Sequence, residues 1–314
     1  MATLFFDILK TARPRQWVKN LTLYAAYIFT AHLYSPQAQL TYFWYVTEAI
    51  AAFTLVAGAV YFFNDIRDVK SDQAHPFKKR RPIASGRISL GKAWATLLIL
   101  VSMGLFWAQI ISPLFFFVLL TYLILMIAYS LWLKNIEVLD VFVIAIGFFL
   151  RVVAGSVVIN AHLPIWFYMC VVATSLFLAV GKRRAELAIL TEQASAHRKV
   201  MGTYTAQILD AYLSMFATAA FMTWSLYTFN FYEQADINSA PATLTLISKT
   251  FTVNKWLMAS IPVVIFGIMR YIRIIYDGSR AETPERVMFA DKPLLISVAI
   301  WAGIVMAVLY WLPK

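Results

Sequence analysis

The chain has 314 residues, of which 61% are hydrophobic and only 14% are charged, and its net charge is +11. Soluble domains average about 25% charged residues, so this composition excludes a soluble enzyme, a disordered protein and a secreted disulfide-bonded scaffold. It predicts a polytopic helical membrane protein. We expect the excess positive charge to face anionic lipid headgroups or anionic substrates in the cytoplasm, and we expect no nucleic-acid partner.

Nine apolar segments are each long enough to cross a bilayer as a helix, which takes about 20 residues. In chain order they cover residues 17–34, 41–63, 92–110, 113–133, 140–158, 164–181, 206–230, 255–276 and 293–312. We therefore predict an all-α fold in which residues 1–314 form a single membrane domain with nine transmembrane helices.

The basic residues predict the orientation of these spans, because Lys and Arg concentrate in cytoplasmic loops. Of the 27 basic residues, 23 fall on one predicted side, Lys249, Lys255 and Lys314 fall on the other, and Arg151 lies within a span. This distribution predicts a multi-pass protein of the plasma (inner) membrane with a cytoplasmic N-terminus and an external C-terminus. The long cytoplasmic loops, 64–91 and 182–205, are expected to cover a membrane-embedded cavity.

An acidic cluster follows the second predicted span. It contains four oxygen-bearing side chains: Asn64, Asp65, Asp68 and Asp72. If the helix continues, the three aspartates point within about 60° of one another, and such oxygen ligands suit Mg²⁺ bound together with substrate phosphates. A basic run at 75–82 follows directly, as a diphosphate site requires. The competing interpretation is a solvated helix end whose acids are neutralised by Arg67 and Lys70.

The pattern N-D-x-x-D-x-x-x-D at 64–72, followed by His-Pro at 75–76 and Arg-Pro-Ile-Ala-Ser-Gly at 81–86, resembles the UbiA superfamily of intramembrane prenyltransferases. The resemblance runs from about residue 13 to the last span. It implies nine helices around a cavity that opens to the cytoplasm. It also implies that the four residues of the acidic motif bind Mg²⁺ and, through the metal, the diphosphate of the donor substrate.

Other segments indicate a branch of this superfamily. Most members join a prenyl diphosphate to an aromatic acceptor and carry a second aspartate-rich motif after the fourth span, where this chain has only Tyr129, Lys134 and Asp140. Four segments resemble decaprenyl-phosphate phosphoribosyltransferases instead: 13–20, 147–155, 181–186 and 284–294. This resemblance implies transfer of 5-phosphoribose from phosphoribosyl diphosphate (PRPP) to a polyprenyl (decaprenyl) phosphate, with release of diphosphate.

A site that holds a diphosphate, a ribose 5-phosphate and a lipid phosphate needs several cations besides Mg²⁺. The predicted cytoplasmic edge supplies Lys19, Lys78, Arg81, Lys134, Lys182 and Arg183. Each of these could equally be an ordinary cytoplasmic charge, because the orientation rule alone explains Lys and Arg there. We expect Tyr61, Tyr129 and Asp140 to join them in binding substrate.

Arg151 lies about 16 Å along the predicted helix from Asp140 and on the same stripe as Gly147, near the middle of the membrane. A charge at that depth is costly and must face a cavity or a partner. It either forms an internal ion pair, for example with Glu48, or binds an anion at the base of a polar cavity, and we favour the second. We expect Asp68, Lys134 and Arg151 to be the catalytic residues.

The expected chemistry is displacement at ribose C1, through an oxocarbenium-like state, by a lipid phosphate that is already ionised. Such a reaction needs no strong general base. One alternative is a prenyltransferase of the same fold that acts on an aromatic acceptor. A more remote alternative is a transporter, which is disfavoured because the motifs cluster at the cytoplasmic edge. The expected partners are the two substrates and membrane lipid, and a homo-oligomer is compatible with the sequence.

Overall fold

The computed structural model describes residues 2–31, 34–75, 77–189, 203–231, 256–277 and 290–311. Within these ranges the chain forms helices and turns and contains no strand, which confirms the all-α prediction. Internal contacts divide the chain into two compact units, Met1–Leu163 and Pro164–Lys314. The predicted single domain remains a prediction, and each unit is described by itself.

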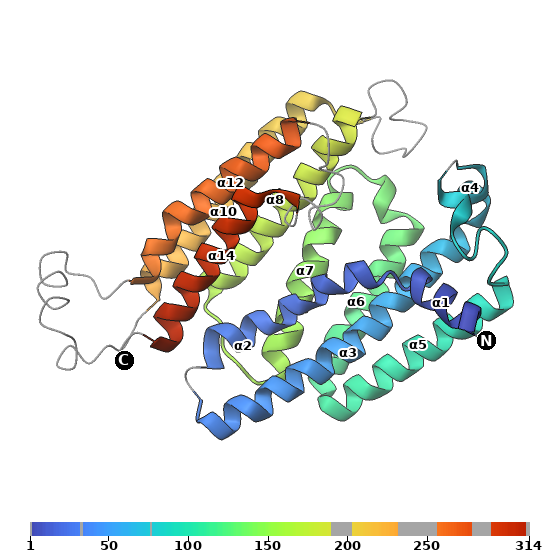
Figure 1. Ribbon diagram of the computed structural model, residues 1–314, viewed down its shortest axis with the longest axis horizontal. Helices are drawn as coiled ribbons and strands as arrows, with labels where there is room; N and C mark the ends of the chain where they lie inside the picture. Colours follow the sequence, from blue (N-terminus) through green and yellow to red (C-terminus); the bar gives the residue numbers. More distant parts are fainter. Residues whose placement is uncertain are drawn as a thin grey trace, which may run out of the picture. The chain divides into compact units, whose positions relative to one another are not determined.

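The first unit contains ten helical elements, which Figure 1 shows in blue and green. They are α1 (Ala2–Thr11), η1 (Pro14–Leu23), α2 (Tyr24–Thr30), α3 (Pro36–Arg67), α4 (Val69–Ala74), η3 (Lys78–Arg80), α5 (Leu90–Ile111), α6 (Pro113–Leu131), η4 (Leu133–Asn135) and α7 (Leu139–Val158). The 32-residue helix α3 packs against α5, α6, α7 and η1 and therefore forms the centre of this unit.

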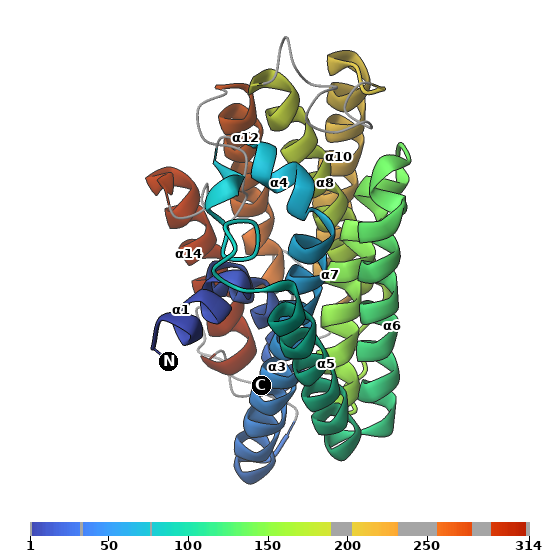
Figure 2. The same cartoon turned by 90° about the vertical axis from the view of Figure 1, so that its right-hand side faces the viewer.

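Small residues allow α3 and α5 to lie side by side, as both views show (Figure 1; Figure 2). A Cβ atom added to Gly104 of α5 would lie 2.6 Å from Val56 Cγ2 and 3.0 Å from the backbone oxygen of Ala52. Membrane helices gain no hydrophobic free energy from pairing, so close backbone approach through small residues is how they obtain packing energy. The glycine at position 104 therefore sets the contact between the two helices.

The first predicted span, 17–34, is not one continuous α-helix. It consists of the 3₁₀ helix η1 followed by α2, and residues 32 and 33 lie outside the described ranges. Because a 3₁₀ helix rises about 2.0 Å per residue, the two pieces together extend roughly 30 Å, which is enough to cross the hydrocarbon core. Arg13, the N-cap of this 3₁₀ segment, reaches Asp65 of α3, and Asn20 within the segment contacts Thr54 of α3 and Arg151 of α7.

The second unit is built from four long helices that lie side by side in Figure 1. Its elements are α8 (Ile165–Ile189), α10 (Ala206–Asn230), η7 (Trp256–Ser260), α12 (Ile261–Tyr276), α14 (Lys292–Met306) and the short π-helix η8 (Ala307–Trp311). The buried indole of Trp224 donates a hydrogen bond to Ser260 Oγ at 3.0 Å and so connects α10 to the start of α12.

Seven helices within the described ranges are long and apolar enough to cross a membrane. They are Pro36–Arg67, Leu90–Ile111, Pro113–Leu131, Leu139–Val158, Ile165–Leu187, Trp256–Tyr276 and Lys292–Trp311. The two other predicted spans, 17–34 and 206–230, are helical over most of their described residues. A multi-pass membrane protein is therefore confirmed, whereas the count of nine spans is not.

Several parts of the predicted topology lie outside the described residues. These include Lys249, Lys255 and Lys314, most of the predicted loop 182–205 and residues 278–289. The predicted loops are also shorter than expected, because α3 continues to Arg67 and α8 continues to Ile189. The orientation of the termini remains a prediction.

We predict that Gly155→Ala destabilises the protein by about 1–3 kcal/mol, because the new Cβ atom overlaps rigid backbone. An added Cβ at Gly155 of α7 would overlap the backbone oxygen of Leu23 and lie 2.8 Å from its carbonyl carbon. The matched control is Gly303→Ala on α14, where nothing lies within 4 Å of the added atom. Thermal unfolding in detergent should lower Tm for the first variant alone, and equal Tm values would contradict this packing.

Candidate active site

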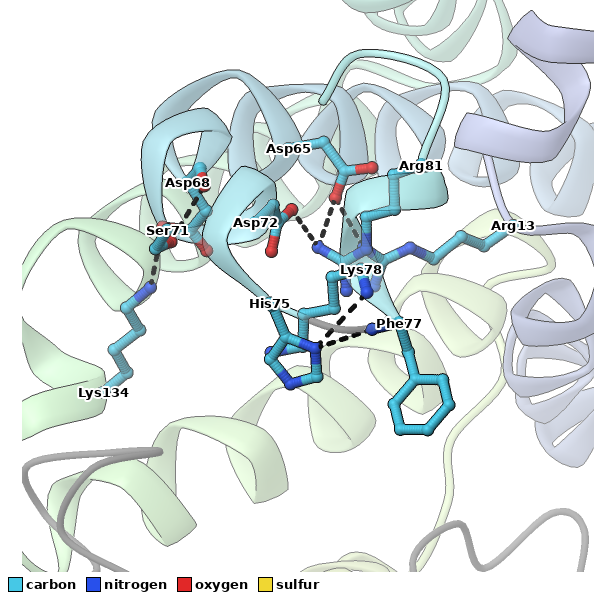
Figure 3. Close-up of polar contacts among 10 residues, drawn as sticks. All are labelled: Arg13, Asp65, Asp68, Ser71, Asp72, His75, Phe77, Lys78, Arg81 and Lys134. Carbon is cyan, nitrogen blue, oxygen red and sulfur yellow. Dashed lines mark hydrogen bonds and ion pairs between the residues drawn. The ribbon is translucent and has the colours of Figure 1, made fainter. Parts of the chain in front are cut away.

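The acidic motif lies where α3 ends and α4 begins. The α-helix ends at Arg67, and Asp68 adopts φ −91° and ψ 8° before α4 starts at Val69. The helix therefore does not continue through the motif, and the predicted single face of three aspartates is not formed. Figure 3 shows that Asp65 and Asp72 turn toward Arg81, whereas Asp68 faces Lys134.

Two of the aspartates are buried and share one guanidinium. Asp65 and Asp72 are 2% and 3% exposed. Arg81 donates hydrogen bonds from Nη1 to Asp72 Oδ2 at 2.6 Å and to Asp65 Oδ1 at 3.2 Å. Because two buried carboxylates repel each other unless a cation lies between them, Arg81 is the residue that holds them together.

Arg13 supplies a second cation to the same cluster. Its Nη2 donates to Asp65 Oδ1 at 2.6 Å, and its guanidinium lies 4.8 Å from the centre of the Tyr61 ring. Arg13 has φ 54°, a left-handed conformation that a non-glycine residue adopts only at a cost. This turn between α1 and η1 directs Arg13 to the end of α3. Arg13 is absent from the site residues predicted from the sequence, although it opens the segment 13–20.

Asp68 forms a separate and weaker ion pair. Its Oδ1 lies 3.7 Å from Lys134 Nζ, and the two side chains are 35% and 19% exposed. Lys134 is placed by η4, which follows the last turn of α6, where Tyr129 is half-buried. Arg67 Nη2 donates to the backbone oxygen of Leu131 at 2.6 Å and so connects the end of α3 to the end of α6.

The basic run after the motif forms a turn around His75. The Nδ1 atom of His75 accepts hydrogen bonds from the backbone N–H groups of Phe77 at 3.2 Å and Lys78 at 3.3 Å (Figure 3). The side chain of Lys78 is exposed, whereas Lys19 on η1 and Asn64 on α3 are half-buried. Of these three residues, only Asn64 lies on α3, the helix that carries the buried Asp65.

Asp140 is fully buried in the first turn of α7, two residues after a strained residue. Val138 has φ 68° and ψ −46°, and the Leu139 N–H donates to the Glu137 oxygen at 2.8 Å. This is a γ-turn of the rare form that is strained for a β-branched residue. Such outliers persist only where the surrounding structure holds them, and they cluster at functional sites.

Arg151 is 7% exposed, and its hydrogen-bond partners are all neutral. It donates from Nε to Asn20 Oδ1 at 3.0 Å, from Nη1 to the Gly147 oxygen at 2.8 Å and from Nη2 to the Tyr122 hydroxyl at 2.9 Å. The alternative of an ion pair with Glu48 is therefore wrong, because Glu48 is exposed and is not among these partners.

Aromatic rings surround this guanidinium. The centres of the Tyr122, Phe53 and Phe148 rings lie 4.8, 5.2 and 5.4 Å from Arg151 Cζ. Asn20, which is also buried, donates in turn to Thr54 Oγ1 at 2.9 Å. Asn20 and Tyr122 were not predicted from the sequence as partners of Arg151, and the position of Asn20 at the end of the segment 13–20 was the only available signal.

The two remaining cations of the predicted site, Lys182 and Arg183, belong to α8 of the second unit. Arg183 is 1% exposed and donates from Nη1 to Glu186 Oε2 at 2.6 Å. Lys182 Nζ lies 3.8 Å from Glu186 Oε1 and is half-buried. Both residues lie on the α-helix rather than in the loop expected from residue 182 onward, and Arg183 contributes to the packing of this unit.

The donor chemistry at the end of α3 fits a Mg²⁺ ion. Within the described ranges, no three His, Cys, Asp or Glu side chains lie close enough together to hold a metal. Magnesium, however, typically takes only one or two carboxylates and completes its shell with water and substrate phosphates. The oxygens of Asp65 and Asp72 already converge on a cationic group, the Arg81 guanidinium. Asn64 and Asp68 are the other oxygen donors of the motif.

Two proteins that are similar to this chain in sequence share one name. The chain is 32% identical to a decaprenyl-phosphate phosphoribosyltransferase of Mycolicibacterium smegmatis over 98% of its own length and 94% of that protein. It is 30% identical to a protein of the same name from Corynebacterium glutamicum, over 98% of this chain and 87% of that one.

Solved structures share the fold at lower sequence identity. A UbiA homolog from Archaeoglobus fulgidus, bound to GPP and Mg²⁺, aligns with a TM-score of 0.65 at 20% identity and covers 96% of this chain and 99% of that chain. The model of the UbiA prenyltransferase family matches residues 21–290. That range contains the whole acidic motif, Lys134 and Arg151. This protein is therefore a member of the UbiA prenyltransferase family.

Proposed function

We propose that this protein transfers 5-phosphoribose from PRPP to a polyprenyl phosphate, such as decaprenyl phosphate, and releases diphosphate. The proposal rests on one observation above all: the near-full-length similarity, at 30% and 32% identity, to proteins named decaprenyl-phosphate phosphoribosyltransferase. We further expect the acidic motif to face the cytoplasm of the cell, where PRPP is dissolved, and the C-terminus to lie outside.

The charges at the end of α3 support this proposal. Arg13, Arg81 and Lys134 all contact aspartates of the motif, and they come from three different parts of the chain. A substrate that carries several phosphate groups can replace these carboxylates as partner of the cations. Charge-assisted hydrogen bonds of this kind are about twice as strong as neutral ones, and the planar guanidinium can bind phosphate through two N–H groups.

In the proposed reaction, an oxygen of the lipid phosphate attacks ribose C1 from the face opposite the diphosphate. The new bond joins C1 to the lipid phosphate oxygen, and the electron pair of the broken C1–O bond leaves with the diphosphate. Because the attacking phosphate is already ionised near neutral pH, the protein needs to position the two substrates rather than remove a proton. Arg81 and Arg13 bind the diphosphate, and Lys134 binds the ribose 5-phosphate.

Asn64, Asp65, Asp68 and Asp72 are the residues that would hold Mg²⁺. When bound, the ion would neutralise charge on the diphosphate leaving group. For Asp65 and Asp72 this requires an exchange of partner, because both carboxylates now pair with Arg81. Asp68 is the most accessible of the three aspartates, with a half-exposed side chain and a long ion pair.

Arg151 is proposed as an anion-binding residue. An arginine has five N–H donors, and those to Asn20, Gly147 and Tyr122 account for three of them. A buried guanidinium whose hydrogen-bond partners are neutral is stabilised further by any anion that reaches it. The surrounding aromatic rings also hold the guanidinium in place, so it loses little freedom when it binds.

The identity of the donor and acceptor substrates can be tested directly. Purified protein with Mg²⁺ should transfer label from radiolabelled PRPP to polyprenyl phosphate and release one diphosphate for each lipid product. A parallel reaction contains a prenyl diphosphate and 4-hydroxybenzoate, the substrates of the alternative aromatic prenyltransferase. Prenylated benzoate formed there, with no label from PRPP entering the lipid phase, would refute the proposed function.

Lys134→Gln should raise the Michaelis constant for PRPP by about 10–150-fold, because it removes a charge-assisted contact worth roughly 1.5–3 kcal/mol. The matched control is Arg273→Gln, which removes a cation from a side chain that is 72% exposed and lies 3.8 Å from Asp277. Steady-state kinetics with varied PRPP should separate the two variants. If both leave the constant unchanged, Lys134 does not bind the donor.

Asp68→Asn should lower turnover strongly and raise the Mg²⁺ concentration needed for half-maximal rate, because it removes one of the proposed oxygen ligands. Asp68 is a better choice than Asp65 or Asp72, whose loss would leave the Arg81 charge with fewer partners and destabilise the fold. Magnesium titrations of wild type and variant provide the measurement. Wild-type activity that persists in excess EDTA would exclude a metal requirement.

A further inference from the structure

Arg67, the last residue of α3, contacts the end of a different membrane helix. Its Nη2 atom donates to the backbone oxygen of Leu131 at 2.6 Å, and Leu131 is the last residue of α6. The last four carbonyl groups of an α-helix have no partner within the helix and carry partial negative charge, so a guanidinium suits this position. The contact joins two segments that are 64 positions apart in the chain.

The same two segments meet a second time at the ion pair of Asp68 and Lys134, which Figure 3 shows facing each other at 3.7 Å. Asp68 follows Arg67 directly, and Lys134 comes three residues after Leu131, in η4. The bond from Arg67 ends on backbone, whereas both ends of the ion pair are flexible side chains. We therefore expect the bond from Arg67 to set the distance between Asp68 and Lys134.

The contact of Arg67 also bears on the competing interpretation of the acidic motif, in which Arg67 and Lys70 neutralise the aspartates. The aspartates pair instead with Arg13, Arg81 and Lys134. Within the part of the chain that the structure describes, neither Arg67 nor Lys70 forms an ion pair. Arg67 is therefore a residue of the motif whose role is a contact between helices rather than the neutralisation of acids.

We infer that Arg67 is a positioning residue for the donor substrate. By holding the end of α6, it fixes Lys134, and with it the binding position of the ribose 5-phosphate, relative to Arg13 and Arg81, which bind the diphosphate. The inference rests on the proposed function, because that function assigns the two phosphate-bearing groups of the donor to these cations. The fixed separation then favours a donor whose diphosphate and phosphate are held apart by a ribose ring, and Arg67 itself does not touch the substrate.

Arg67→Gln should raise the Michaelis constant for PRPP at least roughly threefold, because Lys134 loses its fixed position. The inhibition constant of inorganic diphosphate, which is expected to contact Arg13 and Arg81 but not Lys134, should change less than about twofold. General damage to the fold would raise both constants and would overturn the inference. Lys70→Gln is the matched control, because Lys70 is an exposed cation three residues further along the same motif, and it should leave both constants unchanged.

A double-mutant cycle tests whether Arg67 acts through Lys134. In the Lys134→Gln background, Arg67→Gln should change the PRPP Michaelis constant less than about 1.5-fold, because the side chain that Arg67 positions is no longer present. Two effects that simply multiply in the double variant would show that Arg67 acts independently of Lys134 and would overturn the inference.

Carbodiimide coupling supplies a readout that needs no substrate. A water-soluble carbodiimide condenses a carboxylate with a neighbouring amine, so it can join Asp68 and Lys134 by an amide bond without a spacer. In the full-length protein in detergent, this amide should form at least roughly threefold more slowly in Arg67→Gln than in wild type, as measured by mass spectrometry of the linked peptides. Lys70→Gln should couple at the wild-type rate.

The two kinds of measurement separate the inference from the proposed function. Slower coupling in Arg67→Gln, in a protein that does not use PRPP, would support the positioning of Lys134 and refute only the proposed reaction. An active phosphoribosyltransferase whose Arg67→Gln variant keeps both the PRPP Michaelis constant and the coupling rate of wild type would overturn the inference alone.

Discussion

A charge at the edge of the hydrocarbon core is stable only beside an opposite charge or a polar cavity, and the end of α3 is built around this requirement. Asp65 and Asp72 are buried there, Arg81 pairs with both of them, and Arg13 pairs with Asp65, so the two arginines come from separate segments of the chain. The turn at Arg13, the break at Asp68 and the fold of the basic run around His75 all follow from bringing these groups together. The cluster therefore brings two guanidinium groups to the buried aspartates at the end of α3.

The apolar spans could be predicted from the sequence because bilayer thickness imposes their length. The importance of the acidic motif could also be predicted, since three aspartates directly before a basic run form an uncommon pattern. The break of the helix at Asp68 could not be predicted, because nothing in the local sequence resembles a helix stop and α4 resumes at the next residue. The local pattern fits a continuous helix equally well, and contacts from elsewhere in the fold select the broken form.

The contacts of Arg151 illustrate a second limit. Its depth in the membrane and its need for a partner were evident from the sequence, but the partner considered was the acidic Glu48. The structure instead brings Asn20, which is 131 positions away in the chain, to its Nε atom. A search for oppositely charged partners does not find a neutral amide side chain. The 3₁₀ geometry of η1, which brings Asn20 to that point, is also not predicted by hydrophobic periodicity.

The length of α3 determines the depth in the bilayer at which its acidic end lies. Its 32 residues extend about 48 Å, whereas the hydrocarbon core measures about 30 Å and the bilayer with its headgroups about 40–45 Å. Even with a moderate tilt, the end of such a helix that carries the aspartates reaches the phosphate layer of the surrounding lipids. A lipid phosphate confined to that layer would then be level with the aspartates without leaving the membrane. A water-soluble donor would reach the same level without entering the membrane.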